Sequence, residues 1–519
     1  YGYFHHRNAD GWRENSRYNI NTGYASINYA VNKKLNIGLQ YTRMDYQSQQ
    51  PGGLTDDMFA ANPRQSLRSR NWFSTPWNVT ALTIDYVFNE NTKISVKTFS
   101  IISERNSVGF TKGINVADTF NITLNSYNPR QVDRDSYNNL GSEIRFLKSY
   151  NLLSQKSSLA IGVRAYKGTT IRRQLGTGTT ENDFDLTLTN PVFGRDLNFE
   201  TENYALFAEN LFKIGKRLSI TPGVRYEIIN STAKGYINTT STGTIQENKQ
   251  ERNILLFGLG TELQTSAATN IYANFSQSYR PVTYSELTPS AITDVIDPNL
   301  KDASGYNADF GFRGKIKNFL SFDVGGFYLN YDNRIGTITQ NNLPFRTNIG
   351  TTVSKGVESF VEIDPIRIFT DSSKIGHIRL FASYAYVDAK YTKWNNPAIT
   401  NDPLKSVEGK RVENAPQTIG RYGATYSIKK FSATFQLNQV SEIFTDAANT
   451  EKPNATGTIG KIPSYTVMDA SLTYLFAEKY NLKAGVNNLA DEKYATRRAG
   501  GYPGPGPVSY THLRAHETK

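Results

Sequence analysis

The chain has 519 residues, a formal net charge of +12 and no cysteine. Without cysteine it has no disulfide framework, no thiolate metal site and no cysteine nucleophile. The basic residues form no Lys/Arg run and no recognition-helix pattern, so we expect no nucleic-acid partner. Two explanations of the charge remain open, namely a basic inner surface that attracts anionic ligands and an excess spread over the loops.

The sequence contains no apolar run long enough for a transmembrane helix, which needs about 18 residues or more. Its mean hydropathy is -0.51, and it has 32 tyrosines and 28 phenylalanines. In a membrane-spanning strand only every second side chain meets lipid, so a low mean hydropathy does not exclude a membrane protein. Many aromatic residues are typical of the girdles at the membrane interfaces, although soluble all-β proteins also favour them.

Apolar and polar side chains alternate over many stretches of about ten residues. Examples lie at 82–88, 218–228 and 431–437. Alternation predicts strands, because successive side chains point to opposite faces of a sheet. A long sheet with one apolar and one polar face indicates an all-β fold, a transmembrane antiparallel β-barrel with lipid outside and water inside.

The predicted strands follow one another as hairpins along the whole chain. After an opening strand at 1–7, the pairs are 17–30 with 34–47, 77–88 with 92–105, 134–147 with 157–172, 199–213 with 217–230, 251–265 with 269–278, 304–316 with 318–332, 345–363 with 376–390, 415–428 with 430–443 and 463–476 with 479–489. This gives about 19 strands with alternating short and long connections. The long connections, which we expect at the outer end, cover 48–76, 106–133, 173–198, 231–250, 279–303, 391–414 and 444–462. A single-chain bacterial barrel has an even number of strands, so we expect further strands to complete it.

Six segments resemble one family in the same order along the chain. They are DGWRENS (10–16), QQPGGLTDDMF (49–59), FSQSYRPVTYSEL (275–287), NIGTTVSKGVES (348–359), PSYTVMDASLTYLF (463–476) and LKAGVNNLADEKYATRR (482–498). Together they resemble the TonB-dependent outer-membrane receptors, specifically the ferric dicitrate and siderophore branch. The resemblance extends from residue 1 to about residue 506.

The resemblance implies a 22-strand barrel that an N-terminal plug domain fills. Residues 1–506 then form the barrel, without the plug, the TonB-binding segment, the first two strands and the last one. Residues 507–519 show no strand alternation and resemble a peptide translated from adaptor sequence at the end of an assembled gene. We expect a non-native tail there, in preference to a metal-binding tail formed with His512 and His516.

The resemblance also implies a function in the bacterial outer membrane. It predicts TonB-energised uptake of an anionic ferric chelate, for which ferric citrate or a siderophore is the first candidate. The receptor is expected to be a monomer that contacts the lipid bilayer and lipopolysaccharide. TonB would act through the missing N-terminal segment. The alternative is a passive porin-like or adhesin-like barrel without a plug, and a third candidate is an outer-membrane hydrolase. Within the receptor interpretation, a catecholate, haem, cobalamin or a glycan remains open as the ligand.

No arrangement typical of catalysis appears in the sequence, so we predict no enzyme and no cofactor. His5 and His6 are adjacent on a strand and therefore face opposite sides. The oxygen-rich loop from Asp294 to Asp302 matches no established calcium-loop spacing, so we expect no metal site there.

The candidate ligand contacts are cationic and aromatic residues of the outer loops. An arginine guanidinium keeps its charge and pairs with two carboxylate oxygens at once, which suits an anionic chelate. The alternative interpretation of each arginine is that it is simply solvated. For Arg280 a further alternative is a structural ion pair with Glu286. The candidates are Arg64, Arg68, Arg70, Trp72, Tyr279, Arg280 and Arg411.

Overall fold

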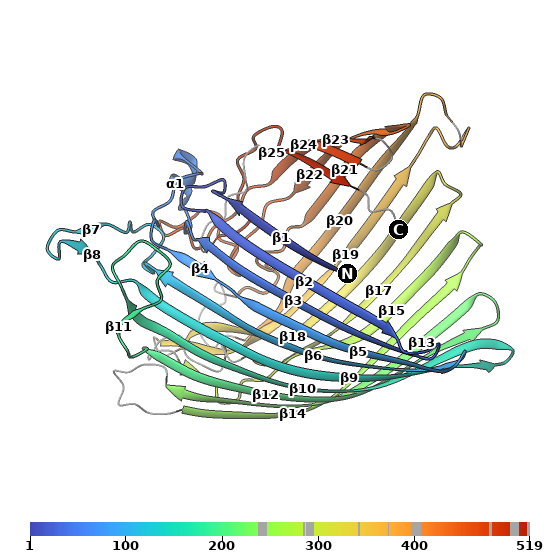
Figure 1. The fold of residues 1–519 in the computed structure, drawn as a ribbon, viewed down its shortest axis with the longest axis horizontal. Helices are drawn as coiled ribbons and strands as arrows, with labels where there is room; N and C mark the ends of the chain where they lie inside the picture. The colour runs from blue at the N-terminus through green and yellow to red at the C-terminus, as the bar shows by residue number, and fades with distance from the viewer. Residues whose placement is uncertain are drawn as a thin grey trace.

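The protein folds into one large curved sheet, antiparallel except where β16 pairs with β19, and a small two-stranded sheet of β7 and β8; its long outer connections gather at one end (Figure 1). The computed structural model describes residues 1–236, 246–283, 286, 295–340, 343–371, 373–395, 406–476, 480–498 and 508–515. In this part of the chain the sheet has 23 strands. No helix among the described residues is long and apolar enough to cross a membrane.

All 19 strands that alternation predicts are present. They are β1 (Gly2–Ala9), β2 (Tyr18–Ala30), β3 (Leu35–Gln49), β5 (Trp77–Asn89), β6 (Thr92–Gly109), β9 (Gln131–Leu152), β10 (Gln155–Gly178), β12 (Arg195–Ile214), β13 (Leu218–Tyr236), β14 (Gln246–Gln264), β15 (Thr269–Arg280), β17 (Ala303–Ile316), β18 (Leu320–Gln340), β19 (Leu343–Ile363), β20 (His377–Trp394), β21 (Thr418–Ile428), β22 (Phe431–Val440), β23 (Tyr465–Phe476) and β24 (Tyr480–Asn487). Each pairs antiparallel with the next in this order, which is the hairpin sequence of an up-and-down barrel.

The remaining elements are short and lie in the long connections, apart from one strand in the tail. They are α1 (Asp56–Ala61), β4 (Trp72–Ser74), β7 (Phe120–Asn121), β8 (Ser126–Tyr127), β11 (Leu188–Asn190) and β16 (Val295–Ile296), with β25 (Val508–Ala515) in the tail. The expectation of no strand after Gly506 was wrong, because β25 pairs antiparallel with β24. The exposed edge of β24 offers backbone N–H and C=O groups, and pairing with them does not require side-chain alternation. A non-native origin of residues 507–519 stays a prediction.

Several strands are longer than alternation predicts. β9 begins at Gln131 and β10 continues to Gly178, inside stretches expected to be loops. Beyond the apolar band both faces of a hairpin meet water, so its strands stay paired while their alternation disappears. The outer hairpins therefore extend well past the region that sequence patterning can detect.

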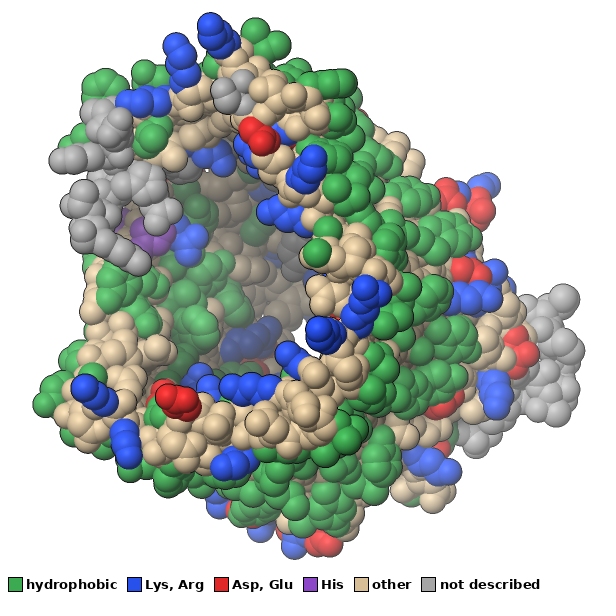
Figure 2. All heavy atoms as spheres, turned by 90° about the vertical axis from the view of Figure 1, so that its right-hand side faces the viewer, with side chains coloured by type: hydrophobic (Ala, Val, Ile, Leu, Met, Phe, Trp, Pro, Cys, Tyr) green, Lys and Arg blue, Asp and Glu red, His purple; other side chains and the backbone are tan. Residues whose placement is uncertain are grey.

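Outward and inward faces differ as the alternation predicts. Val163 on β10 and Leu206 on β12 point outward and are about half exposed. The next positions on these strands, Arg164 and Phe207, point inward. Figure 2 looks into the barrel from the end with the short turns, and shows hydrophobic side chains over the outer wall and Lys and Arg side chains around a hollow lumen. Basic side chains therefore surround the lumen opening at this end, and the two explanations of the net charge both remain open.

Gly350 marks a bulge in β19. The pairing of β19 with β20 shifts register between Thr351 and Thr352, and Gly350 has φ +149. A Cβ atom on Gly350 would lie 2.0 Å from the backbone oxygen of Lys393. Only glycine fits such a backbone conformation and so close a neighbour.

We expect Gly350→Ala to lower the free energy of unfolding by about 1–3 kcal/mol. The added methyl group disfavours the backbone conformation of residue 350 and pushes β19 away from Lys393 on β20. Denaturant unfolding in detergent micelles measures the loss. Gly23→Ala is the matched control, since a Cβ there meets nothing within 4 Å. Equal stability of the two variants would contradict this account of the bulge.

Candidate ligand-binding vestibule

Arg70 lies in the interior of the outer loops. Its side chain is fully buried and forms two hydrogen bonds of 2.8 Å to the carboxylate of Asp118. It also donates to the backbone oxygens of Thr180 and Asn128 and lies over the ring of Tyr127. Arg70 therefore joins three outer loops, and its guanidinium does not face the lumen.

Arg68 has a similar structural role. It donates to the backbone oxygens of Val116 at 2.6 Å and of Lys112 and Gly113 at 2.8 Å. Arg64 is exposed and donates to the backbone oxygen of Trp12 at 2.9 Å. These carbonyl contacts orient both guanidinium groups within the loops.

Trp72 is buried in a small core with Val108 and Val132. Its indole Nε1 donates to the backbone oxygen of Asn182 at 2.7 Å, and Arg17 lies over its ring. The side chain thus stabilises the outer ends of β4, β6 and β9.

The three other candidates are also engaged with neighbouring residues. The Tyr279 hydroxyl donates to the carboxylate of Asp302. Arg280 pairs with Glu286 at 2.7 Å, which was the alternative left open for it. Arg411 reaches the backbone oxygen of Glu442 at 3.3 Å. The structure does not bring the seven candidates into one cluster, and ligand contact by them stays a prediction.

A different set of charged residues meets on the inner wall, close to the outer loops. Arg105 on β6, Asp135 on β9 and Arg172 on β10 are direct neighbours in the register of three adjacent strands. Arg172 Nε lies 3.5 Å and Arg105 Nη1 3.7 Å from Oδ2 of Asp135. We call these three residues and Arg195 the vestibule cluster.

The cluster faces the lumen. Leu140 on β9 and Ile102 on β6 point outward and are more than half exposed. Asp135 is an odd number of residues from Leu140 on β9, and Arg105 is an odd number of residues from Ile102 on β6. Because the pairing of these strands shows no register shift, Asp135 and Arg105 point to the opposite face, inward. The Arg105 side chain is 48% exposed, whereas Asp135 is 1% exposed.

Arg195 on β12 extends the cluster. Its Nη1 donates to Oε1 of Gln174 at 2.9 Å, and the Gln174 amide lies 3.5 Å from Asp135. Arg172 lies over the ring of Phe199 and Arg105 over the ring of Phe73. Stacking on aromatic rings holds the guanidinium groups in place while leaving hydrogen-bond donors in their plane.

Electrostatics in the cluster favour an anionic ligand. The Asp135 carboxylate is almost fully buried beside the guanidinium groups of Arg172 and Arg105, and the Tyr137 hydroxyl lies 3.5 Å from Oδ2 of Asp135. Three guanidinium groups meet the carboxylates of Asp135 and Asp133 in the cluster, so its arginines outnumber its carboxylates by one.

Deeper in the lumen most charges are neutralised within their own strand. Arg145 pairs with Glu143 and Arg225 with Glu227, two residues apart on the same face. Arg164 lies over the ring of Phe99 and forms no ion pair with a described residue. Arg164 therefore differs from Arg145 and Arg225, each of which pairs with a carboxylate on its own strand.

Sequence reasoning did not single out Arg105, Arg172 or Arg195. The available signal was the two-residue period: Arg105 and Arg172 are the last residues of predicted strands, on the inward series, whereas Arg195 lies in a stretch expected to be loop. No group of three or more His, Cys, Asp or Glu side chains in the described part of the chain is placed to hold a metal ion. Asp294 of the oxygen-rich loop lies outside the described residues.

Known proteins resemble this chain in sequence and in fold. The family model described as "TonB dependent receptor-like, beta-barrel" matches residues 3–489. The metal-pseudopaline receptor CntO of Pseudomonas aeruginosa is 24% identical over 320 residues, which cover 59% of this chain and 40% of that protein. The vitamin B12 transporter BtuB of Vibrio vulnificus is 23% identical over 264 residues, covering 49% of this chain and 36% of the relative. The chain thus matches well under half of the length of these curated relatives.

Solved structures show the same fold over almost the whole chain. The unliganded ferric citrate transporter FecA has a TM-score of 0.82 at 22% identity, covering 99% of this chain and 72% of that one. The siderophore receptor PiuA from Acinetobacter baumannii has a TM-score of 0.76 at 14% identity, with 99% and 76% covered.

Proposed function

Because this chain belongs to the TonB-dependent receptor β-barrel family, we propose that it is the barrel wall of a receptor that imports an anionic metal chelate. Ferric citrate is the first candidate, and an anionic ferric siderophore the second. Members of the family are outer-membrane transport receptors, and this protein is located in the bacterial outer membrane. The observation that carries the proposal is the vestibule cluster, with Arg105, Arg172 and Arg195 on the inner wall near the outer loops.

Ligand chemistry supports an anion in preference to a neutral molecule. Carboxylate oxygens of a citrate chelate match guanidinium groups that are fixed on aromatic rings. The surplus positive charge of the lumen also draws anions toward the cluster from outside. The names of the relatives include receptors for metal-pseudopaline, vitamin B12 and rhizobactin, so the alternatives to ferric citrate are a metal chelate of another kind and cobalamin.

The seven loop residues have an indirect part in this proposal. Arg68, Arg70 and Trp72 hold the loops beside Arg105, because Phe73 follows Trp72 directly and lies under the Arg105 guanidinium. Arg64, Tyr279, Arg280 and Arg411 remain candidates for contact with a ligand that fills the mouth. We further propose that uptake uses TonB and a plug supplied by the whole receptor, acting as a monomer among lipid and lipopolysaccharide.

Binding by the full-length receptor tests the substrate. We expect ferric citrate to quench tryptophan fluorescence saturably, because Trp72 lies next to the ring that supports Arg105. A ferric catecholate and cyanocobalamin, titrated at matched absorbance, should quench less at equal concentration. Absence of saturable quenching by ferric citrate, together with quenching by either of the others, would reject ferric citrate as the substrate.

A liposome-swelling assay separates the receptor from a passive porin. We expect full-length protein to block sugar entry and this chain alone to permit it, because the lumen in Figure 2 is wide and open. Free sugar entry through the full-length protein would favour the porin alternative.

A further inference from the structure

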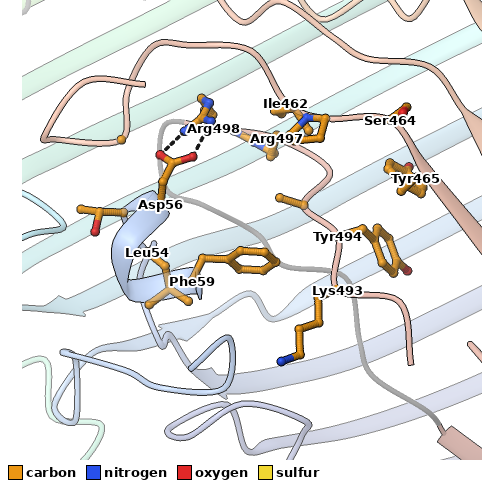
Figure 3. A pocket seen from close by; sticks show the side chains of 14 residues that line it. Leu54, Asp56, Phe59, Ile462, Ser464, Tyr465, Lys493, Tyr494, Arg497 and Arg498 are labelled. Atoms are coloured by element: carbon orange, nitrogen blue, oxygen red, sulfur yellow. Dashed lines mark hydrogen bonds and ion pairs between the residues drawn. The ribbon is translucent and has the colours of Figure 1, made fainter. Parts of the chain in front are cut away.

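An apolar groove of about 780 Å³ crosses the outward face of β20 to β24. It shares no residue with the vestibule cluster or with the small cavity among the outer loops that Arg498 and Asp56 close (Figure 3). Phe435 and Leu472 line the groove and are about half exposed, whereas the next residue on β22, Gln436, is polar and faces the lumen. The groove therefore opens toward the bilayer.

The floor of the groove is a trough of small side chains. It consists of four alanines on four consecutive strands, Ala424, Ala433, Ala470 and Ala484. In the strand register each alanine lies opposite a larger outward side chain, as Ala424 does with Phe435 and Ala433 with Leu472. Small and large side chains therefore alternate across the strands, and the alanines form one diagonal trough. At about 4.8 Å per strand the trough spans roughly 14 Å.

The trough lies near the end with the short turns. Ala433 follows the start of β22 at Phe431 by two residues, and Ala484 follows the start of β24 at Tyr480 by four. At about 3.4 Å per residue the trough is roughly 7–14 Å from the turns. Tyr474 and Tyr480 are exposed on the same outward face, as tyrosines are at a membrane interface. Short turns mark the periplasmic end of such barrels, so the trough faces the inner leaflet of the outer membrane.

The turn between β19 and β20 borders the groove at this end. The hydroxyl of Tyr426, which lines the groove, donates to the backbone oxygen of Ile375 at 2.7 Å. Gly376 has φ +86, and a Cβ atom on it would lie 2.5 Å from the backbone oxygen of Ser427, so only glycine allows this close packing. The same turn leaves Phe369 88% and Ile375 71% exposed. At a membrane interface, lipid covers such side chains.

Two lysines lie beside the same end of the groove. Lys374 precedes β20 and Lys429 follows β21, and these two strands pair as far as His377 and Ser427. Both lysines are exposed. A lysine at a membrane interface lays its methylene stem along apolar surface while its ammonium group reaches an anionic headgroup. A phosphate above a hydrocarbon chain matches this arrangement.

We propose that the groove binds one acyl chain of an anionic glycerophospholipid of the inner leaflet, with the lipid phosphate at Lys374 and Lys429. The backbone groups beneath the trough are engaged in the sheet, so they offer no donor to a polar ligand. Phe435 and Leu472 project beside the trough, so a flat protein surface would leave its floor empty, whereas a flexible chain fills it. Bound lipid would also stabilise β21 to β24 against the neighbouring turn. The proposal is independent of the transported ligand.

Native mass spectrometry of the full chain in detergent micelles tests the proposal, with phosphatidylglycerol as the probe. We expect one phosphatidylglycerol to bind saturably. Zwitterionic phosphatidylcholine should bind about fivefold or more weakly, because its choline group opposes the two lysines. Stepwise addition of many lipids without a saturable first site would reveal a general lipid coat only, and would overturn the proposal.

Variants of the trough and of the lysines locate the site. Ala433→Phe should weaken phosphatidylglycerol at least about tenfold, since the added ring occupies the volume of the acyl chain. Ala273→Phe is the matched control and should leave affinity unchanged, because it places the same ring on an exposed position of β15, two residues before the outward Phe275. The double variant Lys374→Gln with Lys429→Gln should bind both lipids equally. Equal phosphatidylglycerol affinity in the wild type and Ala433→Phe would overturn the proposal.

A second measurement needs no variant. Phosphatidylglycerol with a photoreactive diazirine in its acyl chain should label peptides of β21 to β24 in the wild type, and unlabelled phosphatidylglycerol should compete. Even labelling around the whole outer wall would contradict the proposal. A dimer that Ala433→Phe converts to a monomer would assign the groove to a second copy of the chain, and would contradict it as well.

Discussion

Replacing Arg70 by leucine lowers the free energy of unfolding by about 3–5 kcal/mol, the usual cost of breaking a buried ion pair. The reason is Asp118, whose carboxylate is fully buried and loses both of its hydrogen bonds to the guanidinium. The carbonyls of Thr180 and Asn128 lose a donor as well. Denaturant unfolding in micelles measures the loss, and limited proteolysis shows whether residues 110–130 are cut first.

Two further variants distinguish the ion pair from a general effect of altered loops. The double variant Arg70→Leu with Asp118→Leu should recover most of the stability, because it removes the unpaired charge. Arg64→Ala, in an exposed side chain of the same loop, should change stability by no more than about 0.5 kcal/mol. If Arg64→Ala and Arg70→Leu had equal effects, the assignment of Arg70 as the central tie would be wrong.

The second large effect concerns ligand binding at the vestibule cluster. We expect Arg172→Ala to weaken ferric citrate binding by about 30-fold or more, which corresponds to about 2 kcal/mol or more for a desolvated charge pair. The variant removes one cation and also leaves the buried carboxylate of Asp135 less compensated, so the remaining negative charge repels the ligand. Fluorescence titration of the full-length receptor gives the affinity ratio.

The adjacent residue provides a matched control. Arg173 points outward and pairs with Asp196 at 3.2 Å, so Arg173→Ala removes the same charge from the other face of β10. Its affinity for ferric citrate should stay within about twofold of the wild type, because exposed pairs of this kind contribute little. Equal losses in the two variants would show that net charge, and not the vestibule geometry, governs binding.

Much of the fold was predictable from the sequence for one physical reason. A wall with lipid on one side and water on the other imposes a two-residue period, so every membrane-facing strand leaves a visible pattern. All 19 predicted strands are found, and their hairpin order follows because short turns force neighbours to pair. The pattern fails where both faces meet water, as in the outer parts of β9 and β10, and it missed β25, where a strand forms along a free edge.

The candidate site was less predictable, because the role of an arginine depends on its partners. Arg68, Arg70 and Arg105 belong to the same residue type and lie near the same end of the barrel. The first two are held by backbone oxygens and by Asp118, whereas Arg105 is stacked on Phe73 at the lumen wall. Composition allowed a basic lumen but did not say which cations face it.

The sequence by itself determined the type of fold, the order of the 19 long strands and which side chains alternate between lipid and lumen. It determined these features because they arise from local periodicity and from contacts between neighbouring hairpins. Tertiary structure alone decided which arginines hold the loops together and which face the lumen. Those roles depend on contacts between residues far apart in the chain, such as Arg70 with Thr180 and Arg498 with Asp56, and no local pattern encodes a contact that forms only when distant loops pack together.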